Sequence, residues 1–217
     1  MINFDQKIVA VVIDSIDYKE YDKLFKLFSK EYGKINAYAF GVRRVHSKKI
    51  GALRLFAFCN VFLKSNNEKY GIVDVEILKD FGGISKDYEL FCYASYFVEL
   101  IDYFGYENIE SSDVFYLLYY SFKALIDRKV DTKLIKLIFE LKLLKYQGEY
   151  RESSVLGNVN NTLIYTWDFV LKTLPQKLFS FNLKDDVFKS FEKEVEYDFK
   201  SKVNFRFKSL ERLNEIP

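Results

Sequence analysis

The chain has 217 residues, which is enough for one large domain or two small ones with a buried core. With 49% hydrophobic and 29% charged residues, it has the composition of an ordinary globular protein. The net charge is only +2, so the total charge neither indicates nor excludes a nucleic-acid partner. Its distribution is uneven, because residues 1–80 carry 14 basic and 10 acidic residues and the remainder of the chain has a small acidic excess.

Several kinds of site and location are excluded by simple counts. The two cysteines, Cys59 and Cys92, match no zinc motif and are too few for a disulfide framework, so we expect buried free thiols in a reducing compartment. The N-terminus, MINFDQKIVAVVIDS, has an acidic residue before its apolar stretch and no small-residue cleavage site. No uncharged apolar run reaches the ~18 residues of a membrane helix. We therefore expect a cytoplasmic protein with no membrane partner.

The first eighty residues have the alternating apolar pattern of short β-strands, separated by turns. Six of the nine glycines lie in residues 33–83, where turns and bends need them. Five short strands in about eighty residues predict a small barrel, since a closed barrel has no exposed edges. The expected strands are 8–13, 24–28, 35–42, 53–63 and 70–78.

After Gly82-Gly83 the apolar residues recur at intervals of three and four, which predicts helices. Ser85, Ser112 and Asp131 are expected N-caps, and Gly148 is expected just after a helix end. The sequence thus predicts an α+β protein, with a barrel domain at 1–80 and an all-α domain at 84–217. The expected helices are 85–104, 112–129, 131–148, 162–173 and 184–202.

One window is unusual in charge, because residues 32–67 contain no Asp or Glu but seven cations. Like charges this close repel each other, and an anionic partner offsets that cost. A solvated basic loop is the alternative explanation. The cations of the window are Lys34, Arg43, Arg44, Lys48, Lys49, Arg54 and Lys64.

Each of the two strands that flank this basic loop has one face of uncharged apolar residues, here called the bland face. The other face, here called the mixed face, carries cations and aromatic rings. The bland faces, such as Ile35, Ala37 and Ala39, are expected to line the barrel interior. The mixed faces combine cations with aromatic rings, which is what a single-stranded nucleic-acid surface requires. Tyr38, Phe40 and Phe56 are therefore candidates for base stacking. Burial in the core is the alternative for each ring, because 18% of the chain is aromatic.

Signals for catalysis are weak. There is no phosphate-binding loop, dinucleotide-binding motif, C-x-x-C pair or nucleophile elbow. The single histidine, His46, lies in the basic loop, where a phosphate or base contact is a better explanation than general-base catalysis. We therefore expect no catalytic residues and no enzyme.

The segment GKINAYAFGVRRVHSKKIGALRLFAF resembles the hallmark segment of the bacterial recombination mediator family RecO. YASYFVELIDYF resembles that family's first long helix after the barrel, FELKLLKYQG its helix before a zinc module, and FKSLERL its closing segment. The resemblance implies an N-terminal five-stranded OB-fold barrel, a C-terminal helical domain and a role in DNA repair. It also implies the residues that contact DNA: Lys34, Arg43, Arg44, Lys48, Lys49 and Arg54.

The resemblance further implies binding partners, and this sequence differs from many family members in one feature. RecO proteins bind single- and double-stranded DNA, anneal complementary strands, contact the C-terminal tail of single-strand-binding protein, and help RecA to load together with RecR. Many members carry a four-cysteine zinc module, but here residues 149–160 form a short loop without cysteine, so zinc and other cofactors are expected to be absent. Two alternatives stay open: a protein–protein adaptor on the same fold without DNA binding, and an OB-fold protein that binds RNA.

Overall fold

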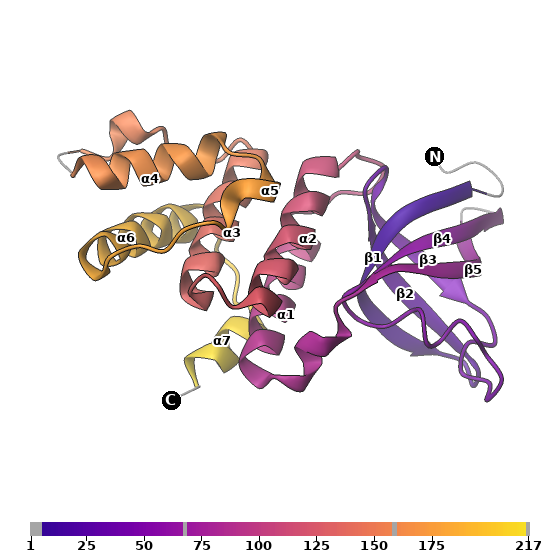
Figure 1. The fold of residues 1–217 in the computed structure, drawn as a ribbon. Coiled ribbons are helices and arrows are strands. Elements are labelled where there is room, and N and C mark those ends of the chain that lie inside the picture. Colours follow the sequence, from indigo (N-terminus) through magenta and orange to yellow (C-terminus); the bar gives the residue numbers. More distant parts are fainter. Residues whose placement is uncertain (1–5, 67–68, 158–159, 216–217) are drawn as a thin grey trace. The chain divides into compact units, whose positions relative to one another are not determined.

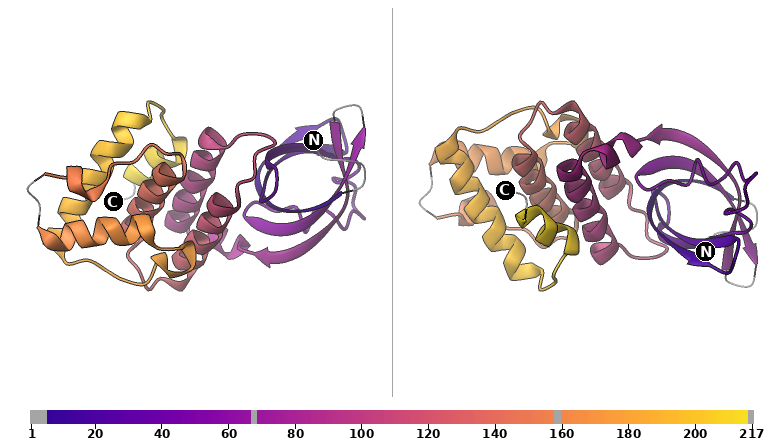
Figure 2. Two further views of the ribbon diagram at one scale, coloured as in Figure 1. Left: turned by 90° about the horizontal axis from the view of Figure 1, so that it is seen from above. Right: turned by 90° about the horizontal axis from the view of Figure 1, so that it is seen from below.

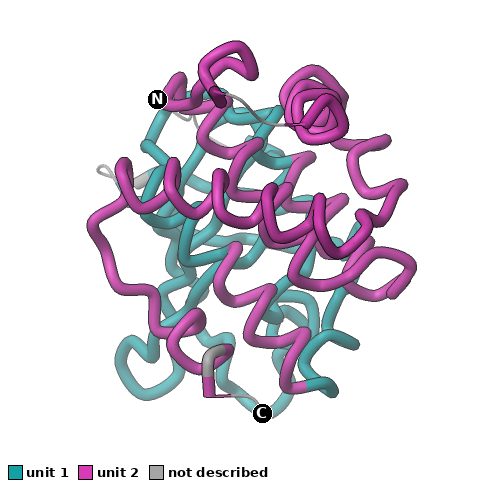
Figure 3. Tube along the Cα trace, turned by 90° about the vertical axis from the view of Figure 1, so that its left-hand side faces the viewer, with its two compact units in different colours: residues 1–87, 98–115 teal, residues 88–97, 116–217 magenta. Residues whose placement is uncertain are grey.

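The computed structural model describes residues 6–66, 69–157 and 160–215 (Figure 1). It forms two compact units, shown in different colours in Figure 3. One unit takes in Met1–Asp87 and Val98–Phe115, and the other takes in Tyr88–Phe97 and Tyr116–Pro217. The first unit therefore contains not only the expected barrel but also the second half of the following helix.

The first unit is a closed five-stranded barrel with the strand order β1-β2-β3-β5-β4. The views from above and below in Figure 2 show the ring that the strands form. Neighbouring strands are antiparallel except for β3 and β5, which among the described residues pair in parallel at two positions, Ala37 with Tyr70 and Tyr38 with Gly71. The strands are β1 (Gln6–Tyr18), β2 (Asp22–Ser29), β3 (Gly33–Ala39), β4 (Ala57–Asn66) and β5 (Lys69–Asp80).

All five strands occur where the sequence predicted them, and the α+β class is confirmed. The main difference is at β1, which continues to Tyr18 beyond its expected end at Ile13. The extension follows a register shift between Val12 and Asp14, and such a bulge lets a strand bend without ending. β3 stops at Ala39, so a long connection of turns lies between it and β4.

The barrel interior is filled by the bland faces that the alternation indicated. Ile35, Ala37 and Ala39 of β3 are buried together with Ala57 and the alternate residues of β4. Small side chains on β3 opposite larger ones elsewhere fit the narrow interior of a five-stranded barrel. The remaining members of this core are Ile8, Ala10, Val12, Phe25, Leu27, Val42, Leu53, Cys59, Val61, Leu63 and Ile72.

The start of β3 is fastened to the segment that follows helix α1 (Tyr88–Phe104), within the first unit. The Lys34 N–H donates to the Tyr106 carbonyl at 3.0 Å, and the Asn108 N–H donates to the Tyr32 carbonyl at 2.8 Å. Gly33 has φ +63°, and a Cβ built there would lie 2.1 Å from the Tyr106 oxygen. Glycine is therefore required here both by the backbone conformation and by the close approach of another segment.

The helices follow the predicted pattern, with two short ones that periodicity did not indicate, α5 and α7. Asp131 is an N-cap as expected, because its carboxylate accepts from the Lys133 and Leu134 N–H groups. None of the described helices is long and apolar enough to span a membrane. After α1 come α2 (Ser112–Asp127), α3 (Thr132–Tyr146), α4 (Asn161–Lys172), α5 (Pro175–Leu178), α6 (Asp185–Lys202) and α7 (Lys208–Asn214), with 3₁₀ turns at Gly82–Lys86 and Ser153–Val155.

Arg151, in the loop between α3 and α4, holds that loop to the helices. Its guanidinium forms ion pairs with Glu194, at 2.9 Å, and with the buried Asp198, both on α6. The Arg151 carbonyl accepts a hydrogen bond from the indole N–H of Trp167 on α4, at 2.9 Å. Within the described ranges, no three His, Cys, Asp or Glu side chains come together as metal ligands would.

Candidate nucleic-acid interface

The basic loop that connects β3 to β4 is folded rather than extended. Gly41, at φ +64°, turns the chain out of β3, and its N–H donates to the Asp22 carboxylate at 2.7 Å. Buried Val42 and Leu53 fix the two ends of the loop to the barrel core. The cations between them therefore project from a surface with a defined backbone.

Three of the six predicted DNA-contacting cations already have carboxylate partners. Arg43 pairs with Asp17 at the end of β1, at 3.2 Å, and Arg54 pairs with Asp80 at the end of β5, at 2.7 Å. These acids lie outside the acid-free window in sequence, but the barrel brings them to it. Arg43 and Arg54 can therefore reach phosphate only by exchanging or sharing a partner.

Lys34 is the most completely engaged of the six. Its ammonium donates to the Asp102 carbonyl at 2.7 Å and lies 3.5 Å from the Asp102 carboxylate, which also pairs with Lys26. The carbonyl belongs to the last turn of α1, where a cation is favourable for the exposed carbonyl groups. The contacts of Lys34 thus stabilise a helix end within the first unit.

The other three predicted cations, Arg44, Lys48 and Lys49, form no ion pair with any carboxylate in the described ranges. Arg44 lies over the ring of Tyr21 at 5.3 Å, and the Lys49 ammonium donates to the Ile72 carbonyl at 3.2 Å. Neither contact neutralises a charge. The loop therefore keeps three positive charges, with exposed His46 between them.

The three candidate stacking rings have different surroundings. Phe40 is 58% exposed, and Tyr38 is partly buried beside it. Their rings are nearly parallel, with an interplanar angle of 11° and centroids 6.0 Å apart. Phe56 is 0% exposed, so its ring is not accessible to a base, and we leave it out of the candidate surface. Its burial is the alternative that the sequence left open.

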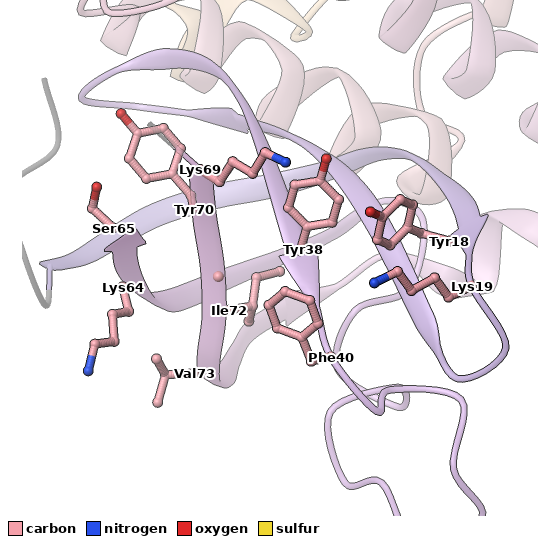
Figure 4. A pocket seen from close by; sticks show the side chains of 11 residues that line it. Tyr18, Lys19, Tyr38, Phe40, Lys64, Ser65, Lys69, Tyr70, Ile72 and Val73 are labelled. Carbon is pink, nitrogen blue, oxygen red and sulfur yellow. The ribbon is translucent and has the colours of Figure 1, made fainter. Parts of the chain in front are cut away.

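Tyr38 and Phe40 belong to a cleft of about 630 Å³ on the barrel surface. Figure 4 shows them between Tyr18 and Lys19 on one side and the β4–β5 hairpin on the other. The β1–β2 turn contributes the first pair, and the hairpin contributes two further lysines. The complete lining is Tyr18, Lys19, Tyr38, Phe40, Lys64, Ser65, Lys69, Tyr70, Gly71, Ile72 and Val73.

Lys19, Lys69, Tyr18 and Tyr70 line this cleft but were not among the candidate residues predicted from the sequence. They lie outside the acid-free window, and Tyr18 and Lys19 fall between the expected strands 8–13 and 24–28. A signal was available in the fold itself, because the loops between strands 1 and 2 and between strands 4 and 5 carry ligand contacts in OB-folds. Once five strands are predicted, the turns between strands 1 and 2 and between strands 4 and 5 can be located in the sequence, and they contain or adjoin these four residues.

The two cysteines are both buried and free, as expected. Cys59, on β4, donates through its thiol to the Ala52 carbonyl at 3.4 Å. Burial, with a smaller contribution from the nearby Asp80 charge, raises the pKa of Cys59 to about 12. A thiol in this state is neither a nucleophile nor a metal ligand at neutral pH.

Comparison with known proteins identifies the family. The pattern described as "Recombination protein O N terminal" matches residues 1–81, and "Recombination protein O C terminal" matches residues 85–155. The chain belongs to the RecO family. The expectation that it is not an enzyme agrees with this family of non-enzymatic recombination mediators.

Individual RecO relatives agree with this assignment. A "DNA repair protein RecO" from Clostridium novyi is 34% identical over 160 residues, covering 72% of this chain and 62% of the relative. Proteins with the same description from Caldanaerobacter subterraneus and Listeria innocua are 32% and 27% identical over 142 and 145 residues. Those matches cover 65% and 67% of this chain, and 58% and 56% of the relatives. The chain thus spans about three fifths of the length of these RecO proteins.

Proposed function

We propose that this RecO-family chain is a non-catalytic recombination mediator of the cytoplasm. It binds single- and double-stranded DNA through phosphate contacts, promotes the annealing of complementary strands, and acts with RecR to load RecA onto DNA coated by single-strand-binding protein. The RecR contact and the contact with the C-terminal tail of single-strand-binding protein are proposed from family membership. The barrel surface supports the DNA contact directly.

The observation that carries the proposal is the charge of the β3–β4 loop. Arg44, Lys48 and Lys49 are held on one folded loop without a carboxylate partner in the described ranges. Three adjacent positive charges repel one another, and a phosphate backbone relieves that repulsion while releasing its own counterions. No base-specific contact is needed, which suits a protein that binds DNA of any sequence.

A second candidate, an adaptor without DNA binding, is favoured by a different observation. Lys34, Arg43 and Arg54 are already paired with Asp102, Asp17 and Asp80. Half of the predicted basic surface is therefore neutralised within the chain. An adaptor would use the remaining loop charges for an acidic protein partner.

A salt titration separates the two candidates. The change is Arg44→Gln, Lys48→Gln and Lys49→Gln in one variant, and the probe is a labelled single-stranded oligonucleotide. If all three cations meet phosphates, the log–log slope of affinity against salt should become shallower by about 2 in the variant. The same variant should also bind a duplex probe more weakly, because the contacts are to phosphate.

A matched control carries the same charge change elsewhere. Lys177→Gln, Lys189→Gln and Lys193→Gln remove three exposed positive charges from the second unit. The control should keep the slope of the wild-type chain. Equal slopes for the wild type and the loop variant, with RecR binding weakened in the loop variant, would reject the DNA proposal and support the adaptor. Tighter binding to RNA than to DNA of the same sequence would indicate the RNA-binding alternative instead.

A further inference from the structure

The aromatic cleft has a spacing that duplex DNA does not match. Tyr38 and Phe40 are alternate residues of one chain segment, and their nearly parallel rings lie 6.0 Å apart. Bases along one strand of a duplex are only ~3.4 Å apart. Two neighbouring bases can therefore each occupy one ring only if they have separated from each other, which a single strand allows and an intact duplex does not.

The rings are also held in place for such a contact. The Tyr18 ring meets Tyr38 edge-on, with centroids 4.9 Å apart and an angle of 62°. This packing fixes Tyr38, while the neighbouring Phe40 stays 58% exposed. An exposed apolar ring next to a fixed parallel ring is a ready stacking platform, since every base has a flat π-face.

Positive charge lies on two sides of the rings, where the phosphates of a bound strand would pass. Lys19 comes from the β1–β2 turn, and Lys64 and Lys69 come from the β4–β5 hairpin (Figure 4). The Lys69 ammonium is 5.8 Å from the centre of the Tyr38 ring. No ion pair within the described ranges involves any of these three lysines. Among the described residues, the cleft thus combines flat apolar faces with cations that have no carboxylate partner.

Gly71 lines the cleft next to Phe40. It pairs with Tyr38 across the short parallel contact between β3 and β5. A Cβ added at Gly71 would lie 3.7 Å from an edge carbon of the Phe40 ring, which is ordinary van der Waals contact. Alanine would fit there, but a larger side chain would enter the space beside Phe40.

We propose that this cleft is a single-strand site, in which two neighbouring bases stack on Tyr38 and Phe40 while Lys19, Lys64 and Lys69 contact the phosphates. The inference rests on the proposed DNA-binding function and assigns its single-strand component to the cleft. The β3–β4 loop then provides phosphate contacts that single and double strands share. An acidic peptide is a poorer occupant, because it would use the lysines but has no use for two spaced flat rings.

The test uses the full chain with Tyr38→Leu and Phe40→Leu combined, and two probes of equal length: a labelled oligothymidylate and a labelled duplex. Two base stacks at the lower end of their usual strength predict a roughly thirtyfold loss of affinity for the single strand. Affinity for the duplex should change less than about twofold, since the phosphate contacts remain. A matched control, Tyr106→Leu with Tyr165→Leu, removes two exposed rings elsewhere and should change neither affinity.

The outcomes separate this inference from the proposed function. If the cleft variant binds both probes as the wild type does, while the loop variant weakens both, the single-strand site is rejected and the DNA proposal stands. An equal loss for both probes also rejects it, because the cleft would then not distinguish single from double strands. If the wild-type chain binds neither probe, the proposed function fails first.

A second variant covers the case in which the double substitution disturbs the barrel. Gly71→Val leaves both rings in place and fills the space beside Phe40, so it should weaken oligothymidylate binding and spare the duplex. Unchanged binding by Gly71→Val, in a chain with native circular dichroism, would reject the site. A competition experiment adds a further check. If a polyglutamate peptide displaces the labelled oligothymidylate as effectively as unlabelled oligothymidylate does, the cleft recognises charge alone, and the single-strand site is rejected.

Discussion

Replacing Gly33 by alanine should destabilise the barrel far more than the same change at other glycines with a similar backbone. Gly33 has φ +63°, and that conformation costs an L-residue about 1–2 kcal/mol. The new Cβ would also lie 2.1 Å from the Tyr106 carbonyl oxygen, and a real Cβ cannot come so close. The segment that contains Tyr106 must therefore move away from β3.

The size of the second effect follows from the hydrogen bonds of that segment. Three backbone bonds join residues 106–111 to residues 30–34: Lys34 to Tyr106 at 3.0 Å, Asn108 to Tyr32 at 2.8 Å, and Ser111 to Lys30 at 3.0 Å. Each is worth about 0.5–1.5 kcal/mol net. Losing one or two of them together with the backbone cost predicts a total loss of about 2–5 kcal/mol.

Gly41→Ala is the matched control within the same unit. Gly41 has φ +64°, but the nearest atoms to its added Cβ belong to the flexible Arg44 side chain, at 3.6 Å. Only the backbone cost of about 1–2 kcal/mol applies there. Urea unfolding followed by far-ultraviolet circular dichroism measures the difference, which should move the midpoint of Gly33→Ala below that of Gly41→Ala by about 1 M.

The fluorescence of Trp167 provides an internal reference, because this single tryptophan lies in the second unit. Its transition should respond less to Gly33→Ala than the circular dichroism does. Equal midpoints for the two alanine variants would refute the reasoning, since the contact with Tyr106 would then have no energetic consequence.

Three further predictions follow from the described contacts. Lys34→Gln should lower the urea midpoint of unfolding and leave the salt slope of DNA binding unchanged, because the Lys34 ammonium is bound to Asp102. A shallower slope in this variant would show that Lys34 contacts DNA. Cys59 should resist alkylation in the native chain at pH 8, where a pKa of about 12 leaves roughly one thiol in 10⁴ ionised; mass spectrometry should find the adduct only after unfolding, and rapid native labelling would contradict its burial. Arg151→Met should cost about 3–5 kcal/mol by leaving the buried Asp198 unpaired, and adding Asp198→Asn should recover most of that loss. Burial already raises the pKa of Asp198, so the cost of Arg151→Met should shrink as the pH falls and the carboxyl becomes neutral; a constant cost across pH would argue against this origin.

The barrel and the helices were predictable because their signals are local. Alternation within β3 and β4 identifies the buried faces directly, and Asp131 caps a helix through its own neighbours. The extension of β1 to Tyr18 was not predictable from that signal, because the bulge at Val12–Asp14 interrupts the alternation. The burial of Phe56 also depends on packing, since its position in the pattern was equally consistent with an exposed ring.

The acids that neutralise the window could not be predicted for a related reason. Arg43 forms an ion pair with Asp17, Arg54 with Asp80, and Lys34 with Asp102, and in each pair the two residues are far apart in sequence. Ion pairs of this kind depend on which strand and helix ends meet, and charge patterning along the chain does not contain that information. The resemblance of the segment to RecO proteins indicated a candidate surface, but it could not separate cations that form ion pairs within the fold from cations that remain available.

The lack of acidic residues in residues 32–67 affects the paired cations and the loop cations differently. The fold supplies carboxylates to Lys34 and Arg54 at the ends of α1 and β5, where a charged pair fastens one element to another. It supplies none from the described ranges to the loop cations Arg44 and Lys48. If acids were present within the window, they would be close enough in sequence to pair with those loop cations and cancel them. Their absence therefore keeps a local positive surface on a chain whose net charge is only +2, and the salt slope of the loop variant measures that surface directly.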